Sequence, residues 1–175
     1  MKRLVLDADG VLADFLTHTL TILGPEAPER ELIQTWDILD SLPAKWRTVV
    51  RKRWVEPGWC LSIPDMPDLP DFHALQDTEI VIATSPMPDA PHWISERTIW
   101  LGARGFQNVV FTRHKEDVPG DVMVDDKVEN VESWAEHHPT GIAYLFDAPY
   151  NRHQRITHKN IIRTDSWSRI LSSFR

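Results

Sequence analysis

The sequence contains a single cysteine, Cys60, among its 175 residues. One cysteine excludes an internal disulfide and is typical of a protein in a reducing compartment. Long apolar runs are missing as well. The amino-terminal segment MKRLVLDADG is basic and then apolar for only three residues, too few for a secretory signal, and no stretch reaches the length of a membrane span. We therefore expect a cytoplasmic protein that has no membrane partner.

Basic residues are in the minority. The 19 Lys and Arg stand against 26 Asp and Glu, which gives a formal net charge of −7 at pH 7. A long phosphate backbone would be repelled by this charge, and no basic stripe is present, so we expect no nucleic-acid partner. A small phosphorylated metabolite is still compatible, because a bound metal can reverse the charge locally.

Short apolar segments alternate with amphipathic segments over most of the chain. Five strands are predicted by apolar runs at residues 4–6, 80–83, 109–111, 122–124 and 142–146. Helices are predicted by helical spacing at residues 11–23, 91–103, 128–137 and 166–174. Strands separated by helices indicate an α/β fold, in which a Rossmann-like parallel sheet lies between two layers of helices.

Residues 24–77 interrupt this alternation. Prolines and tryptophans accumulate there, and the pattern predicts short helices at 29–39 and 44–54 followed by an irregular stretch at 55–71. We interpret 24–77 as a small helical cap inserted after the first strand. Residues 1–23 and 78–175 then form the core that carries the chemistry.

Polar side chains stand where four of the predicted strands end or shortly beyond. In chain order they are Asp7 and Asp9, Thr84 and Ser85, Lys115, and Asp125 and Asp126. Ligands of an open parallel sheet bind beyond the carboxyl ends of its strands. We therefore expect these four groups to converge on one site.

The residue types in this set suit phosphate chemistry. Asp7, Asp9 and Asp125 offer the hard oxygen ligands that Mg²⁺ prefers, and no His or Cys accompanies them as zinc would require. With Mg²⁺ and Lys115 offsetting the phosphate charge, Asp7 can attack phosphorus and form an aspartyl-phosphate. Asp9 can protonate the leaving oxygen and then take a proton from the hydrolytic water. The residues predict a phosphomonoester hydrolase.

The same segments resemble a known superfamily. LVLDADGVLADF, VIATSP, HK at 114–115 and VMVDDK are similar, in order, to the four motifs of the haloacid dehalogenase-like phosphatases. DGVLADF, ATSP, FTRHK, VDDK and the distal LFDAPYNR further resemble the 5′(3′)-deoxyribonucleotidase branch. The resemblance spans nearly the whole chain and implies a Rossmann-like core with a small helical cap.

The resemblance also implies roles for individual residues. Asp7 would be the nucleophile and Asp9 the general acid/base. Mg²⁺ would be bound by Asp7, the main-chain carbonyl of Asp9 and the side chain of Asp125. The phosphoryl group would be bound by Thr84, Ser85 and Lys115, with Asp126 supporting Asp125 and Lys115 from behind.

Substrate recognition is expected to involve the cap. Phe15 matches a family position that lines the nucleoside pocket, although its amphipathic helix equally suits a core role. Trp59 could stack on a base, or it could hold the small cap together. The implied substrates are (deoxy)nucleoside monophosphates, and because relatives in this branch often form dimers, a homodimer is an expected assembly.

Two other kinds of function fit the same residues. One is a phosphatase for another small phosphomonoester or for nucleic-acid ends, and the net charge speaks against the nucleic acid. The other is a nucleotide-binding module without turnover. The filled catalytic positions argue against it.

Overall fold

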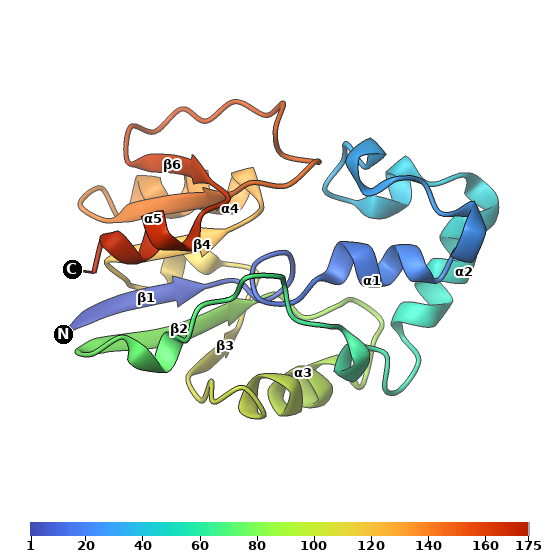
Figure 1. The fold of residues 1–175 in the computed structure, drawn as a ribbon, viewed down its shortest axis with the longest axis horizontal. Coiled ribbons are helices and arrows are strands. Elements are labelled where there is room, and N and C mark those ends of the chain that lie inside the picture. Colours follow the sequence, from blue (N-terminus) through green and yellow to red (C-terminus); the bar gives the residue numbers. More distant parts are fainter. Residues whose placement is uncertain (175) are drawn as a thin grey trace.

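The structure, a computed structural model, describes residues 1–174 (Figure 1). Within that range a six-stranded sheet has the order β3-β2-β1-β4-β5-β6, and all neighbouring strands are parallel. The strands are β1 (Lys2–Leu6), β2 (Thr78–Thr84), β3 (Val109–Phe111), β4 (Val122–Asp125), β5 (Ile142–Phe146) and β6 (Ile161–Thr164). The parallel sheet confirms the predicted α/β, Rossmann-like fold.

Helices cover both faces of the sheet. The α-helices of the described residues are α1 (Phe15–Thr21), α2 (Ala44–Trp54), α3 (Trp93–Gly102), α4 (Val128–His137) and α5 (Trp167–Ser172), and α3, α4 and α5 are the ones that cover the sheet. Residues of α4 pack with the Val5 side of the sheet, whereas residues of α3 and α5 pack with the Leu4 and Leu6 side. None of the helices in residues 1–174 is both long enough and apolar enough to cross a bilayer.

Strand β1 lies in the middle of the sheet because both of its faces are apolar. Leu4, Val5 and Leu6 are all completely buried. Leu6 pairs with Ile82 of β2 on one side and with Val124 of β4 on the other. The residues that follow β1, β2 and β4 therefore emerge next to one another at the same edge of the sheet.

The first predicted helix is shorter than expected. Residues 11–14 do not continue α1, because the chain folds back after β1 and the amides of Leu12 and Ala13 both donate to the carbonyl of Ala8. Helix α1 starts only after Asp14, whose side chain accepts a hydrogen bond from the Thr17 amide as an N-cap.

Two other predictions differ from the structure. The helix predicted at 29–39 is wrong: the chain forms two 3₁₀ turns, Arg30–Leu32 and Ile38–Ser41. The side chain of Asp37 accepts from the Leu39 amide, and such local bonds compete with a continuous helix. Strand β6 was not predicted, because the short segment IIRT contains an arginine and follows a polar stretch.

The cap lies beyond the carboxyl edge of the sheet, where α1 and α2 stand apart from the strands (Figure 1). Two adjacent segments connect it to the core: the Asp14 amide donates to the Pro64 carbonyl, and the Met66 amide donates to the Leu12 carbonyl. Helix α1 packs against α2, since Trp54 Nε1 donates to Thr19 Oγ1 at 3.0 Å. The boundary at residue 24 stays a prediction, and these contacts favour an earlier one.

Strand β1 should be the element on which stability depends most. Leu6→Ala is expected to lower the free energy of unfolding by about 2–5 kcal/mol, because truncation of a fully buried leucine leaves a cavity. The control Ile99→Ala removes a side chain that is 61% exposed on α3 and should change stability by less than about 0.5 kcal/mol. Urea unfolding followed by circular dichroism measures both variants. Equal losses would contradict this account of the core.

Candidate active site

The predicted catalytic residues meet at the carboxyl edge of the sheet. Asp7 follows β1, Thr84 ends β2 and Asp125 ends β4, while Lys115 begins the 3₁₀ turn Lys115–Asp117 beyond β3. Lys115 Nζ lies 2.7 Å from Asp7 Oδ1 and 2.6 Å from Asp125 Oδ2. The buried ammonium therefore joins residues that are distant in sequence, as the strand order requires.

A group of carboxylates surrounds this ammonium. Oxygen atoms of Asp7, Asp125 and Asp126 all lie within 4.8 Å of one another, and all three residues are buried. Asp125 is held in place by the Lys127 amide, at 2.9 Å from Oδ1, and by Asn130 Nδ2. An all-oxygen set of this kind suits a hard divalent cation. Asp126, which is predicted to support Asp125 and Lys115, also has a carboxylate oxygen within this 4.8 Å group.

The loop after β1 passes very close to Asp126. Gly10 has φ +78°, and a Cβ atom there would lie 2.0 Å from Asp126 Oδ2 and 2.9 Å from the hydroxyl of Tyr150. Tyr150 itself donates a hydrogen bond to Asp126 Oδ2. Only glycine fits this position, because it combines left-handed backbone with no side chain.

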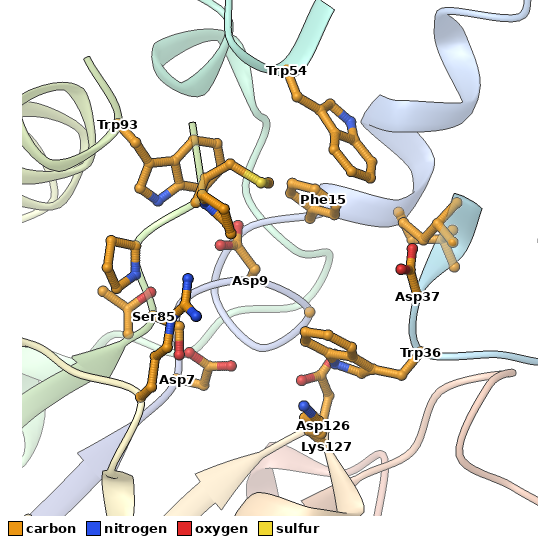
Figure 2. Close-up of a pocket in the computed structure, with 18 of the residues that line it drawn as sticks. Asp7, Asp9, Phe15, Trp36, Asp37, Trp54, Ser85, Trp93, Asp126 and Lys127 are labelled. Carbon is orange, nitrogen blue, oxygen red and sulfur yellow. The ribbon is translucent and has the colours of Figure 1, made fainter. Parts of the chain in front are cut away.

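The second aspartate of the loop has a different partner. Asp9 Oδ1 accepts a hydrogen bond from Arg97 Nη2 of α3 at 2.5 Å. Figure 2 shows the Asp9 carboxyl turned away from Asp7, toward the side of the cavity where Trp93 lies. The carboxyls of Asp7 and Asp9 therefore lie in separate environments although only one residue separates them in sequence.

Burial is the largest cause of the raised pKa values of Asp7, Asp9 and Asp126. It raises the pKa of Asp7 to about 7, with Lys115 opposing the shift and Asp125 adding to it. Burial also raises the pKa of Asp9, and here Arg97 is the main opposing charge. The pKa of Asp126 is raised well above its usual value by burial and by the charge of Asp125. The single ammonium of Lys115 does not compensate the three carboxylates of Asp7, Asp125 and Asp126. The group therefore favours the binding of protons or of an additional cation.

A cavity of about 770 Å³ opens above these residues, between the core and the cap (Figure 2). Its floor includes Asp7, Asp9, Thr84, Ser85 and Lys115. Ser85 is partly engaged, since its hydroxyl donates to the Thr112 carbonyl at 3.1 Å. The predicted phosphate-binding residues thus share one cavity with the predicted nucleophile.

Aromatic side chains line the cavity from both the cap and α3. Phe15 lines the cavity together with Trp36, Trp54 and Trp93. Trp59 does not, which differs from its predicted place in the pocket. It is 3% exposed, and its ring packs edge-on to Phe15 at a centroid distance of 5.4 Å and stacks on Trp93 at 6.1 Å. Trp59 supports the lining residues from behind.

Several residues of the site were not predicted as such. Tyr150 lies in the LFDAPYNR segment, and its place after a core strand was a usable signal. Lys127 follows the paired aspartates directly, and its Nζ lies 3.9 Å from the ring centroid of Trp36. Arg97 had no signal in the sequence, since it stands in the polar stretch SERT at 95–98 of an ordinary helix.

The sheet, the loop after its central strand and the inserted cap define the class of haloacid dehalogenase-like hydrolases. A solved structure described as a haloacid dehalogenase-like hydrolase, from Burkholderia xenovorans LB400, shares this fold with a TM-score of 0.54. It is 12% identical to this chain, and the match covers 93% of this chain and 91% of that one. At this identity the likeness shows the fold alone.

Sequence comparisons narrow the class. The family described as 5′ nucleotidase, deoxy (pyrimidine), cytosolic type C matches residues 2–173. The human "5′(3′)-deoxyribonucleotidase, cytosolic type" is 31% identical, and the match covers 99% of this chain and 94% of the relative. The Bacillus subtilis "5′(3′)-deoxyribonucleotidase" is 25% identical, with 97% of each chain covered. The chain belongs to the 5′(3′)-deoxyribonucleotidase family of phosphatases, which confirms the resemblance of its motifs.

Gly10 provides a test of the loop geometry. Gly10→Ala should destabilise the protein by at least about 2 kcal/mol more than Gly58→Ala, because both positions have positive φ but only Gly10 faces a clash. A Cβ at Gly58 would meet nothing within 4 Å. Urea unfolding measures the difference. Similar losses for the two variants would show that Asp126 and Tyr150 do not confine the loop.

The raised pKa of Asp7 predicts a pH dependence of stability in the metal-free protein. A carboxyl that binds its proton more tightly when folded stabilises fully below its usual pKa of 3.8, and this contribution is lost as the pH rises through about 7. Asp7→Asn should therefore flatten the fall in stability between about pH 4 and pH 7. Urea unfolding in chelator across this range is the measurement, with the exposed Asp40→Asn as control. An unchanged slope in Asp7→Asn would refute the shift.

Proposed function

We propose that this protein hydrolyses (deoxy)nucleoside monophosphates in a Mg²⁺-dependent reaction that passes through an aspartyl-phosphate on Asp7. The observation that carries the proposal is the position of Lys115, which binds both Asp7 and Asp125 at the floor of a cavity with aromatic walls. The family names of the relatives support the substrate class.

Asp7 is arranged as a nucleophile. Its Oδ1 accepts hydrogen bonds from the Ala8 amide at 2.7 Å and from Lys115 Nζ, so Oδ2 is the oxygen left to attack phosphorus. Fixing one oxygen orients the other and lowers the entropic cost of attack. Lys115 also offsets the charge of the incoming phosphoryl group, as Thr84 and Ser85 orient its oxygens from the end of β2.

The carboxylate group fits a magnesium site. Asp7, the main-chain carbonyl of Asp9 and the side chain of Asp125 would hold the ion, with Asp126 adjacent. When bound, Mg²⁺ would supply the positive charge that lets an anionic nucleophile approach an anionic phosphate.

Asp9 would move the protons. It would donate one to the leaving oxygen as the bond from that oxygen to phosphorus breaks. It would then take one from the water that attacks the aspartyl-phosphate and releases Asp7. Burial raises the pKa of Asp9, which favours the protonated form needed for the first step.

The cavity wall supports a preference for deoxyribose. Phe15, Leu16 and Trp54 offer apolar surface on the cap side. A 2′-hydroxyl buried against such a wall would lose its bonds to water without gaining a partner. We expect deoxynucleotides to be hydrolysed faster than the matching ribonucleotides.

The proposal extends to the setting of the enzyme. We place it in the cytoplasm, which its one cysteine and the cytosolic type of the human relative support. A homodimer stays a prediction.

A substrate panel tests the function. Wild type with Mg²⁺ should release phosphate from 5′- or 3′-deoxynucleotides, and Asp7→Asn should lower the rate by at least about a thousandfold because it removes the nucleophile. Nucleotide binding by Asp7→Asn, measured by calorimetry, should persist. Asp40→Asn, at an exposed position, serves as the matched control.

Two results would contradict the proposal. Phosphate release from sugar phosphates but from no nucleotide would refute the substrate class while keeping the chemistry. Equal rates for wild type and Asp7→Asn would refute the nucleophile.

A further inference from the structure

Arg97 is an arginine whose charge is entirely enclosed. The side chain is 0% exposed, and its one ion-pair partner among the described residues is Asp9. Its Nε and Nη1 atoms are buried and make no hydrogen bond within residues 1–174. A buried guanidinium with unsatisfied donors is costly, so its contact with Asp9 calls for an explanation beyond general stability.

Two tryptophans fix the guanidinium in place. Arg97 Cζ lies 5.0 Å from the ring centroid of Trp93 and 5.2 Å from that of Trp100. Trp100 is itself held by a 2.7 Å hydrogen bond from Nε1 to the Ile63 carbonyl. Cation–π contacts on both sides favour the charged side chain and restrict its rotamers. Arg97 is therefore a rigid donor aimed at Asp9.

Asp9 is the partner of this pair that faces the cavity. Its side chain keeps 25% exposure and lines the cavity, whereas Arg97 is fully covered. Arg97 occupies Oδ1, which leaves Oδ2 as the oxygen outside this contact. A carboxyl can accept through Oδ1 in both protonation states, so the contact survives when Oδ2 carries a proton.

We infer that Arg97 is a positioning residue for Asp9: by binding Oδ1, it directs Oδ2 at the leaving oxygen of the substrate. This inference rests on the proposed function. In the first step the bond from Asp7 to phosphorus forms, the bond from phosphorus to the leaving oxygen breaks, and the proton on Oδ2 passes to that oxygen. In the second step Oδ2 receives a proton from water, whose oxygen bonds to phosphorus as Asp7 is released.

The alternative is that Arg97 only ties α3 to the first loop. The two roles differ in which substrates they affect. A deoxynucleotide leaves as an alkoxide and needs a proton from Asp9, whereas p-nitrophenolate leaves p-nitrophenyl phosphate as a stable anion. Misplacing Asp9 should slow the first substrate far more than the second, while a loosened fold should slow both alike.

The experiment compares kcat/KM for a deoxynucleoside monophosphate and for p-nitrophenyl phosphate, because kcat/KM reports the step in which the leaving group departs. Arg97→Met, which keeps length and removes every donor, should lower kcat/KM for the nucleotide at least about tenfold more than for the aryl phosphate. The loss should fall mainly on kcat. Asp9→Asn should likewise lower kcat/KM more for the nucleotide than for the aryl phosphate. Adding Arg97→Met to Asp9→Asn should cause little further loss, since both changes remove one function.

Arg104→Met is the matched control. Arg104 also lies over Trp100, at 3.5 Å from the ring centroid, but it binds Asp65 instead of Asp9. It should not change the ratio between the two substrates.

The outcomes are separable. An equal loss on both substrates in folded Arg97→Met would overturn the inference. If Arg97→Met fails to fold, Arg97→Lys decides the question: it keeps the charge but only one donating group, and the inference requires a smaller shift of the ratio in the same direction. If wild type hydrolyses no nucleotide, it is the proposed function that fails.

Discussion

The contact of Lys115 with both Asp7 and Asp125 is the constraint on which the rest of the site depends. The ammonium and the two carboxylates are all buried, so each would be costly alone. The pairing is available because β1 lies between β2 and β4, with the turn that follows β3 at the same edge. The group still carries more negative than positive charge once Asp126 is included. The fold thus leaves an excess of negative charge at the carboxyl edge of the sheet. This excess favours the binding of a further cation, which a phosphatase of this class can use to bind a phosphate.

Much of this arrangement could be predicted from the sequence. Apolar runs such as residues 4–6 and 122–124 predict core strands, and parallel strands bring their carboxyl ends to one edge, so Asp7 and Asp125 were expected to converge there. That β1 and β4 are direct neighbours is a finding of the structure. The parts that could not be predicted depend on tertiary contacts. Residues 29–39 have helical composition but form two 3₁₀ turns, of which the second is capped by the side chain of Asp37. The partner of Asp9 lies 88 residues away on α3 and could not be read from spacing.

The contacts between the cap and the core across the cavity are more exposed than the contacts within the floor of the site. On the core side the ion pairs are buried. Across the cavity, Arg152 pairs with Glu31 at the surface, with side chains 46% and 59% exposed, and Lys127 lies over the ring of Trp36. Exposed ion pairs contribute about 0–1 kcal/mol, and exposed cation–π contacts are similarly weak. On this side the cavity is therefore bordered by contacts that are easily broken, whereas on the side of α3 the buried Trp59 of the cap stacks on Trp93.

The two aspartates of the first loop show how one short segment can serve two chemical steps. Asp7 and Asp9 share the same loop and are both buried enough that their pKa values rise. They differ in the cation that each contacts: Lys115 from the turn after β3 for Asp7, and Arg97 from α3 for Asp9. Lys115 is shared between two carboxylates, whereas Arg97 is committed to one. Because the cations come from different elements and hold one oxygen each, the second oxygen of each carboxyl is left outside these contacts. In the proposed reaction one of these oxygens would attack phosphorus and the other would carry the proton.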